Sequence, residues 1–333
     1  MKKAAKFFLS TCLITTIAFS ARASSLPASM AGEIGVPSGK IAYIHDKDVW
    51  VMDWDGKSQF KVVTATNAAG KVSWAPDGKR IAFSRSGTVT TESPDLLGGS
   101  HRIYDIFIGY LDSAQSNTNF WFRLTDGLGG RYPEWSADGK QIMFTNDLNA
   151  HLANPVYPNY QTCFMDTTGG SYRIQRRDYE GTEYYSLMPT YGPGQQVAYV
   201  LYKSINPVGV VISSLDKKTF NDADFSGGKL KLIQGATGPA WSPDGKWIAY
   251  VDYRITDQAI HIVTPDLSQS FVVYKPTAGL NLQTFPLSWS PDSKWLTFGT
   301  SDGSLWIIDI TGNQLKQITG PGLNSAPAWS KTE

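Results

Sequence analysis

The chain has 333 residues, which is enough for two domains of ordinary size or for one large all-β or α/β domain. Positive and negative charges nearly balance, with 30 Lys and Arg residues against 29 Asp and Glu residues, so a nucleic-acid-binding surface is not expected. Glycine and proline are frequent and aromatic residues make up 13% of the chain, which favours many short strands and turns over helices. This composition excludes a coiled coil, a disordered chain and a protein with many membrane spans.

Residues 1–23 have the three parts of a secretory signal peptide. A lysine-rich start is followed by an apolar run at residues 7–19, and the sequence Ala-Arg-Ala ends the segment at Ala23. The apolar run is shorter than the roughly 20 residues of a membrane-spanning helix. We therefore expect cleavage after Ala23 and export of the remaining chain, in which no later stretch is long and apolar enough to span a bilayer.

The cysteine content limits how the exported chain is stabilised. Of the two cysteines, Cys12 lies within the signal segment, so only Cys163 remains after cleavage. A chain with one cysteine has no intramolecular disulfide and depends on packing for its stability. Cys163 lies in the apolar stretch of residues 160–165, which predicts a buried thiol.

A repeated sequence pattern in the body of the chain indicates the fold class. The copy WSPDGKWIAY begins at Trp241. Related copies are WAPDGKRIAF from Trp74, WSADGKQIMF from Trp135, the degenerate YGPGQQVAY from Tyr191, and WSPDSKWLTF from Trp289. Successive aromatic markers are roughly 40 to 61 residues apart, which is within or slightly beyond the period of a propeller blade.

Each repeat predicts four antiparallel strands. The first strand carries the aromatic marker, and the Ser-Pro-Asp-Gly sequence then forms a tight turn, because proline presets φ and glycine adopts a positive φ. A second strand follows at once. Third strands are predicted at residues 48–53, 104–108, 209–212, 259–262 and 304–309. Fourth, outer strands are predicted at residues 120–124, 230–233, 271–274 and 315–318.

The first repeat is split between the two ends of the chain. The sequence SGKIAYI, from Ser38, lacks the part that carries the tryptophan, and the fragment PAWS at residues 327–330 supplies it. We therefore predict an all-β fold over residues 38–333, a six-bladed β-propeller of four-stranded antiparallel blades. Its C-terminal strand would complete the first blade and close the ring, leaving no incomplete blade at either end of the chain. Residues 24–37 would form a short N-terminal extension.

The repeat W-S-P-D-G-K-x-I-A-F resembles that of the TolB-like six-bladed propeller family, and the resemblance covers about residues 38–330. It is also similar to the repeat in propellers of prolyl-oligopeptidase-type peptidases and oligogalacturonate lyases. The resemblance to TolB implies a non-catalytic, protein-binding scaffold in the periplasm or cell envelope, with an envelope protein such as a peptidoglycan-associated lipoprotein as its partner. Residues 24–37 are too few for the N-terminal domain of TolB, so no TolA-type interaction carried by that domain is expected.

The repeated residues are expected to build the fold and not a catalytic site. The tryptophans would pack between blades, and the Asp-Gly-Lys sequences would form turns. The sequence from Gly299 to Gly303 matches the nucleophile motif G-x-S-x-G, with Ser301 at its centre. That motif requires a strand before it and a helix after it, whereas a predicted strand follows Gly303 directly. We interpret it as a hairpin turn and predict that the protein is not an enzyme.

The histidines leave one alternative open. Their spacing places no two of them as ligands on one strand or helix, so we predict no cofactor. Oligogalacturonate lyases gather histidines from several blades around a metal, and the resemblance therefore keeps a divalent-metal site at His101, His151 and His261 as an alternative. A glycan-binding protein or a metal-dependent glycan lyase would be the corresponding function. A small-molecule-sensing subunit of a partner enzyme is a third function.

Insertions interrupt the repeat between second and third strands at residues 84–102, 146–159 and 253–258. In a propeller these connections share one face with the links between blades, and such loops carry binding residues. Residues 155–160 hold two prolines and two tyrosines, which favours a docking surface or a glycan platform. We predict partner-binding residues on this face: Arg85, Glu92, Asp95, His101, Arg102, Asp147, His151, Tyr157, Tyr160, Lys203, Arg254 and Asp257. We expect a monomer that presents these loops rigidly.

Overall fold

The computed structural model describes residues 26–27, 32–64, 67–90, 100–112, 120–127, 129–148, 159–174, 184–203, 206–216, 231–253, 258–277, 279–284 and 286–332. The predicted signal peptide lies outside these ranges, as do Glu92, Asp95, His151, Tyr157, Arg254 and Asp257. The side chains of residues 88–90 and 100–103 are outside the description too, although their backbone lies in strands. Within the described ranges, no helix is long and apolar enough to cross a membrane.

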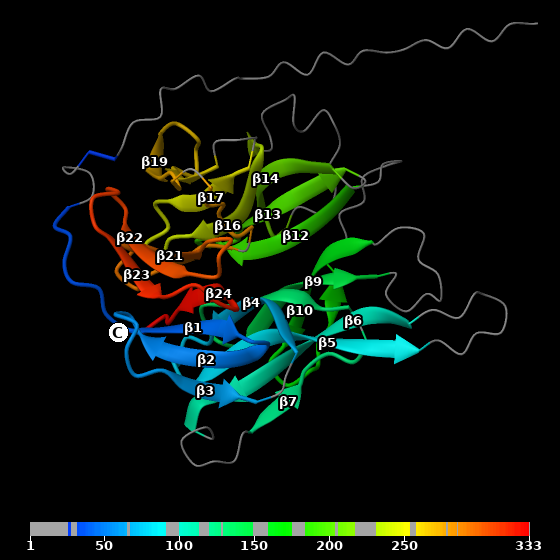
Figure 1. Cartoon of the computed structure of the whole chain (residues 1–333). Coiled ribbons are helices and arrows are strands. Elements are labelled where there is room, and N and C mark those ends of the chain that lie inside the picture. Colours follow the sequence, from blue (N-terminus) through cyan, green and yellow to red (C-terminus); the bar gives the residue numbers. More distant parts are fainter. Residues whose placement is uncertain are drawn as a thin grey trace, which may run out of the picture.

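Six four-stranded antiparallel sheets are arranged as blades around a ring (Figure 1), which confirms the predicted six-bladed β-propeller. From the inner to the outer strand, the first three blades are β24 (Asn324–Trp329), β1 (Lys40–His45), β2 (Asp48–Asp53) and β3 (Phe60–Val63); β4 (Ala68–Trp74), β5 (Arg80–Thr90), β6 (Ser100–Tyr110) and β7 (Trp121–Arg123); and β8 (Arg131–Trp135), β9 (Gln141–Asp147), β10 (Tyr160–Asp166) and β11 (Arg173–Ile174). The other three are β12 (Tyr184–Tyr191), β13 (Gln196–Lys203), β14 (Asn206–Ser214) and β15 (Lys231–Gln234); β16 (Ala236–Trp241), β17 (Ile248–Asp252), β18 (Ala259–Val263) and β19 (Ser270–Tyr274); and β20 (Ser288–Trp289), β21 (Trp295–Gly299), β22 (Leu305–Asp309) and β23 (Leu315–Thr319).

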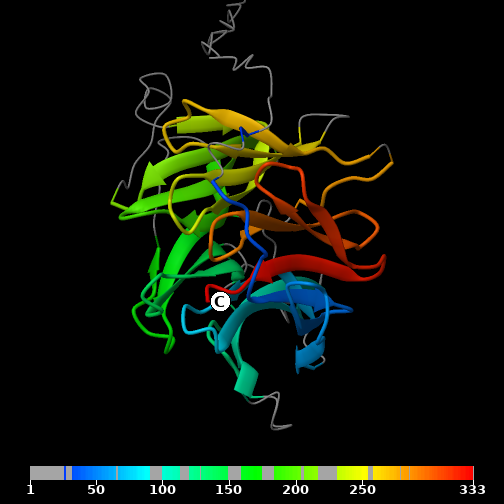
Figure 2. The same cartoon turned by 90° about the vertical axis from the view of Figure 1, so that its left-hand side faces the viewer.

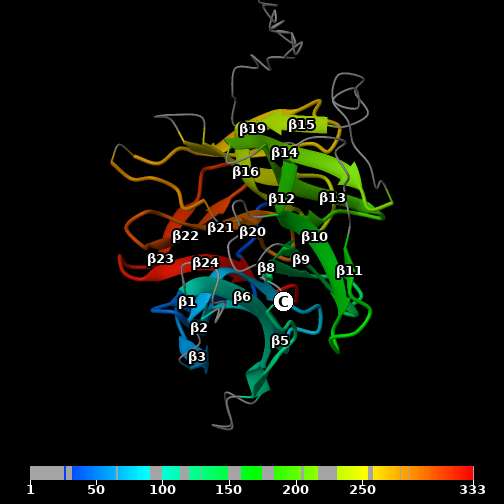
Figure 3. The ribbon, with the colours of Figure 1, turned by 90° about the vertical axis from the view of Figure 1, so that its right-hand side faces the viewer.

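The ring closes between the two ends of the chain, as the split repeat predicts. Strand β24 pairs antiparallel with β1 and places Asn324 opposite His45. Beyond the last strand pair, the Ser330 N–H donates to the Lys40 carbonyl at 2.8 Å, and the Lys40 N–H donates to Ser330 Oγ at 3.0 Å. Figures 2 and 3 show the closed ring from its two sides. Pairing with β24 therefore covers the inner edge of β1 and completes the first blade.

Hydrophobic clusters fill the spaces between neighbouring blades. In one of them, side chains of β1 and β2 pack against Trp74 and Phe83 of the next blade. The indole N–H of Trp74 donates to the Ala328 carbonyl at 2.9 Å, and that of Trp289 donates to the Ala240 carbonyl at 2.9 Å. In both cases the acceptor belongs to the inner strand of the preceding blade. The prediction that the repeated tryptophans pack between blades is confirmed.

The repeated aspartates close the turns between first and second strands. In one such turn the Ser242 hydroxyl donates to Asp244 Oδ1 at 2.6 Å, and the Lys246 N–H donates to the same oxygen at 3.1 Å. Gly245 has a φ of 72° in this turn, which favours glycine because a Cβ is disfavoured there. The same backbone contact recurs for Asp77, Asp138 and Asp292. These residues therefore build turns, as the repeat predicts.

The insertion predicted at residues 84–102 is strand over much of its length, which corrects the assignment of Arg85, His101 and Arg102 to a loop. Strand β5 continues to Thr90 and β6 begins at Ser100, with Arg85 opposite Asp105 and Arg102 opposite Thr88. The residues that extend β5 are Thr-Val-Thr, and β-branched side chains favour strands. The hairpin ladder therefore runs past the usual end of a blade.

The propeller has two different faces. Connections from second to third strands and links between blades lie on one face, called the loop face here and turned to the viewer in Figure 3. The Asp-capped turns and the connections from third to fourth strands lie on the opposite face, called the turn face, which Figure 2 shows.

The N-terminal extension crosses the turn face as a strap, formed by Leu26 and residues 32–39 (Figure 2). Leu26 is buried in the apolar cluster that contains Trp289. The Trp295 indole N–H donates to the Gly35 carbonyl at 3.3 Å, and the Lys294 ammonium donates to the Glu33 carbonyl. These contacts hold the N-terminal strap to the last blades before the chain enters β1.

Candidate functional site

The predicted partner-binding residues that the structure describes lie in strands, with Arg85 inside β5 and Asp147, Tyr160 and Lys203 at strand ends near the loop face. The guanidinium of Arg85 lies 5.6 Å from the centroid of the Phe107 ring and 5.3 Å from that of the Trp121 ring, so it stacks on the outer part of the second blade. Asp147 ends β9, and its Oδ1 accepts the Asn159 N–H at 2.8 Å. Arg85 is therefore held away from Asp147, on a different blade.

Two further predicted residues lie nearer to the third and fourth blades. Tyr160 begins β10 and is paired with Asp147 across the sheet, so the structure brings these two predicted residues together. Lys203 ends β13 in the next blade and is exposed. His101 and Arg102 lie in β6, with their side chains outside the description.

A cluster that the repeat pattern does not reveal surrounds Arg131, the first residue of inner strand β8. The Arg131 guanidinium lies 3.8 Å from the centroid of the Tyr104 ring and 5.4 Å from that of the Tyr160 ring. The hydroxyl of Tyr132 lies close enough to Arg131, Tyr104, Tyr160 and Tyr202 to interact with them electrostatically. Because Tyr104 comes from the second blade, Arg131 from the third and Tyr202 from the fourth, the cluster lies where three blades meet. We call these five residues the tyrosine–arginine cluster.

Burial favours the neutral form of three tyrosine hydroxyls in this cluster, those of Tyr132, Tyr160 and Tyr202. Burial raises the pKa of Tyr132 to about 12, although the neighbouring Arg131 charge acts in the opposite direction. Burial also raises the pKa of Tyr160 and that of Tyr202. Neutral phenols carry an O–H that can donate a hydrogen bond, so the cluster is a group of hydrogen-bond donors.

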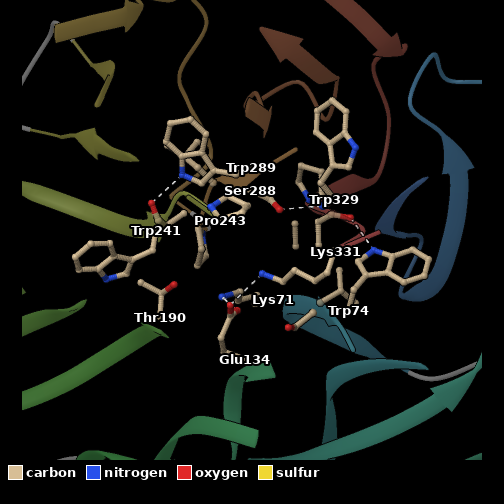
Figure 4. Close-up of a pocket in the computed structure, with 18 residues that line it drawn as sticks. Lys71, Trp74, Glu134, Thr190, Trp241, Pro243, Ser288, Trp289, Trp329 and Lys331 are labelled. Carbon is tan, nitrogen blue, oxygen red and sulfur yellow. Dashed lines mark hydrogen bonds and ion pairs between the residues drawn. The ribbon is translucent and has the colours of Figure 1, made fainter. Parts of the chain in front are cut away.

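A bulge in β8 separates this cluster from the central channel. The pairing of β8 with β9 shifts register between Arg131 and Glu134, and Tyr132 within the bulge has a φ of 54°. A bulge changes the direction in which the neighbouring side chains point. Arg131 consequently belongs to the loop face, whereas Glu134 lines a pocket in the channel (Figure 4).

The channel pocket contains a buried carboxylate between two ammonium groups. Glu134 forms an ion pair with Lys71 of β4 and a second one, at 3.5 Å, with Lys331 beyond β24. The Glu134 side chain is 9% exposed and that of Lys71 is 13% exposed. Figure 4 shows the three side chains converging among the aromatic markers of the inner strands. We call these three residues the channel triad.

The charge of Glu134 depends on its lysine neighbours. Burial alone would raise the pKa of this carboxyl, but the charges of Lys71 and Lys331 more than offset burial and hold the pKa below its usual value. The carboxylate is therefore ionised at neutral pH, and its charge is matched by Lys71 in particular. This arrangement suits a structural link between inner strands of neighbouring blades, since the rest of the pocket lining is largely apolar, with Ser73, Thr190 and Ser288 as its neutral polar residues.

His261 and Cys163 both lie within strands of the blades. His261 lies in the middle of β18, where its ring stacks on Tyr250 at a centroid distance of 5.2 Å. Cys163 is buried, and burial raises the pKa of its thiol to about 11, so the predicted buried thiol is confirmed. Among the described residues, no group of three His, Cys, Asp or Glu side chains is arranged to hold a metal ion; His151 and the side chain of His101 lie outside that set.

Ser301 lies in a hairpin turn, as predicted. The Gly303 N–H donates to the Thr300 carbonyl at 2.9 Å, and strand β22 begins two residues later. Gly303 has a φ of 78°, and a Cβ at this position would lie 1.8 Å from the Gly322 carbonyl oxygen. The motif therefore serves the close approach of two backbone segments and not a nucleophile elbow.

A glycine substitution tests this role of the motif. We expect Gly303→Ala to lower the free energy of unfolding by about 2 kcal/mol, because the added methyl group forces two backbone segments apart at an unfavourable φ. Gly320→Ala is the matched control, since a Cβ at Gly320 meets no atom within 4 Å. Urea unfolding of both variants would measure the difference, and equal stability of the two would contradict the backbone role.

The propeller is similar to solved structures of other proteins. No family model matches the chain, and no curated protein sequence matches it. TolB from Acinetobacter baumannii matches the structure with a TM-score of 0.65 and 20% sequence identity, over 91% of this chain and 69% of that chain. The fold is TolB-like.

Two further solved structures support the same conclusion about the fold. A candidate TolB from Agrobacterium tumefaciens matches with a TM-score of 0.53 and 15% identity, over 86% of this chain and 90% of that chain. A chain of a nidogen/laminin complex matches with a TM-score of 0.59 and 10% identity, over 87% of this chain and 97% of that chain. At such identities the likeness describes the propeller alone, which occurs in proteins of different function.

Proposed function

We propose that this chain is an exported, non-catalytic β-propeller that binds another protein of the cell envelope through its loop face. The observation that carries this proposal is the difference between the two faces. One arginine and four tyrosines gather toward the loop face in the tyrosine–arginine cluster, and the Arg85 guanidinium stacks separately on the outer part of the second blade. Arginine and tyrosine are the residue types that dominate binding energy at protein interfaces. The Asp-capped turns of the opposite face instead use their polar groups internally.

The architecture supports a rigid scaffold. Each blade shares an apolar cluster with its neighbour, and the ring closes by hydrogen bonds between the two ends of the chain. A face held in this way can bind a partner with little rearrangement, which lowers the entropy lost on binding. The TolB-like fold and the signal-like N-terminal sequence together favour the periplasm, and a peptidoglycan-associated lipoprotein is the partner that we would test first.

Charge reversal on the loop face tests the proposal. We expect the double variant Arg102→Glu/Arg254→Glu to bind the partner about tenfold more weakly, because Arg102 lies in the extension of the β5–β6 hairpin toward this face and Arg254 belongs to the sequence insertion at residues 253–258. The melting temperature should stay unchanged. Lys140→Glu is the matched control, since Lys140 is an exposed lysine in a turn on the opposite face.

The partner would be identified by affinity capture from crosslinked envelope extracts, with the tagged chain from Ser24 onward and mass spectrometry of the retained proteins. One dominant envelope protein that the double variant loses and the control retains would support the scaffold. Equal retention by all three proteins would remove the loop face from the interface. An empty capture combined with a tightly held divalent metal, lost on mutation of His101 and His151, would favour a metal-dependent glycan lyase.

A further inference from the structure

Arg131 differs from Arg80, which also stacks on an aromatic ring in this propeller. Arg80 stacks on Trp135 at 4.7 Å and also donates to the Asp77 carboxylate at 2.8 Å. The guanidinium of Arg131 makes no hydrogen bond or ion pair with any described residue, and its Nε is buried without an acceptor. A buried charged donor without an acceptor costs free energy, so this side chain lacks the partner that Arg80 has.

The position of the Arg131 guanidinium is fixed by its aromatic neighbours. The centroid of the Tyr104 ring, on β6 of the second blade, lies 3.8 Å from the guanidinium. That of the Tyr160 ring, on β10 of the third blade, lies 5.4 Å from it. Stacking of this kind holds the planar group in one orientation without using its N–H donors. The Nη donors of Arg131 therefore remain available to a ligand.

The hydroxyls around Arg131 are available in the same way. Within the described part of the chain, the hydroxyls of Tyr104, Tyr132, Tyr160 and Tyr202 form no hydrogen bond with a protein group. Asp147 is the nearby carboxylate that acts on Tyr160, and its Oδ1 already accepts the Asn159 N–H. The cluster thus combines one cation with several neutral O–H donors.

We propose that the tyrosine–arginine cluster binds a carboxylate, and that the natural source of this carboxylate is an acidic side chain of the protein partner. A carboxylate accepts two parallel hydrogen bonds from a guanidinium, and its remaining lone pairs would accept from tyrosine hydroxyls. The arginine covers one face of the stacked tyrosine rings, so that face cannot stack on a sugar ring. The O–H groups at the ring edges stay free, which suits an oxyanion. This proposal rests on the proposed function, because it assigns a role to the same loop face.

Titration of labelled protein with a defined acidic probe tests the site. The probe is a short polyglutamate peptide with an acetylated N-terminus and an amidated C-terminus, and a polyglutamine peptide of equal length is its neutral counterpart. In the full exported chain with 15N-labelled arginine, the Arg131 Nε–H resonance is assigned by its loss in Arg131→Gln. We expect polyglutamate to shift this resonance with saturation, and polyglutamine to leave it in place.

Matched variants separate the site from general attraction between charges. Arg131→Gln should weaken polyglutamate binding about tenfold, whereas Arg80→Gln, which removes a stacked arginine that already has a carboxylate, should not. Tyr160→Phe keeps the ring and removes one hydroxyl, so an intermediate loss is expected. Unchanged melting temperatures would show that each variant is folded.

The outcomes distinguish this site from the proposed function. An unshifted resonance, or equal weakening by Arg131→Gln and Arg80→Gln, would overturn the carboxylate site even if a partner protein is captured. A response to an oligosaccharide of uronic acids without any response to polyglutamate would overturn the peptide as the source. Saturable binding of polyglutamate with an empty capture would instead retain the site and contradict the envelope-protein scaffold.

Discussion

Deletion of residues 326–333 is expected to abolish the cooperative thermal unfolding of the propeller. The deletion removes four of the six residues of β24, including Trp329, which is 1% exposed, and the carbonyl that accepts the Trp74 indole N–H. It also exposes the inner edge of β1, and an unpaired strand edge promotes aggregation. Loss of a buried tryptophan alone costs about 3–5 kcal/mol, which is a large fraction of the stability of an ordinary domain.

Differential scanning calorimetry of the truncated and complete chains would measure this effect. Deletion of residues 331–333 alone is the matched control, since it removes an equally terminal segment but keeps β24 and its pairing with β1. We expect this control to retain a cooperative transition with a small loss of stability from the missing Lys331 contact. An unchanged melting temperature in the longer deletion would show that β24 does not close the ring.

Substitution Glu134→Gln is expected to lower the free energy of unfolding by about 3 kcal/mol. It removes the carboxylate that faces the Lys71 ammonium, whose side chain is only 13% exposed, and a buried charge without its partner is strongly unfavourable. Lys331 is 43% exposed, so its ammonium can turn to water. Urea unfolding followed by tryptophan fluorescence would measure the difference.

A double variant separates the charge from the packing. In Lys71→Met/Glu134→Leu both buried charges are replaced by apolar side chains of similar volume, which costs little or even stabilises in comparable cases. We expect this variant to be more stable than Glu134→Gln. If the two were equally unstable, the loss in Glu134→Gln would come from altered packing in the channel and not from an unpaired ammonium.

The stability difference between the natural chain and Glu134→Gln is expected to depend on pH. Because the pKa of Glu134 is lower in the folded protein than in the unfolded chain, its ionisation stabilises the fold above the unfolded value, about 4.3. This contribution is lost as the pH falls through the folded pKa. The difference in unfolding free energy between the natural chain and Glu134→Gln should therefore be full at pH 7 and shrink in acid.

Much of the fold follows from the sequence because its determinants are local. The Ser-Pro-Asp-Gly turn is specified by residues that are adjacent in the chain, as the contacts of Asp244 with Ser242 and Lys246 show. The split first repeat also follows from the sequence, because the C-terminal fragment contains the tryptophan that the copy at Ser38 lacks. The length of β5 and β6 was harder to predict, since a hairpin can extend into what the repeat marks as an insertion.

The candidate sites could not be predicted in the same way because they join residues that are far apart in sequence. The channel triad combines residues of β4, β8 and the C-terminal end, and its lysines carry no distinguishing pattern. The tyrosine–arginine cluster draws on three blades, and of its members only Tyr160 was predicted as a binding residue. Proline at residue 133, directly after Tyr132, is a sequence signal for the bulge in the inner strand. That signal does not reveal which side chains meet there.

Both ends of the described chain lie on the turn face. The N-terminal strap crosses this face from Leu26, and Thr332 lies near the turn at Gly78. A linker, a tag or a tether joined to either end would consequently leave from the side opposite the tyrosine–arginine cluster. A propeller attached in this way to a sensor chip or to a membrane would point its loop face outward. The positions of the two chain ends therefore determine which face of the attached propeller is exposed.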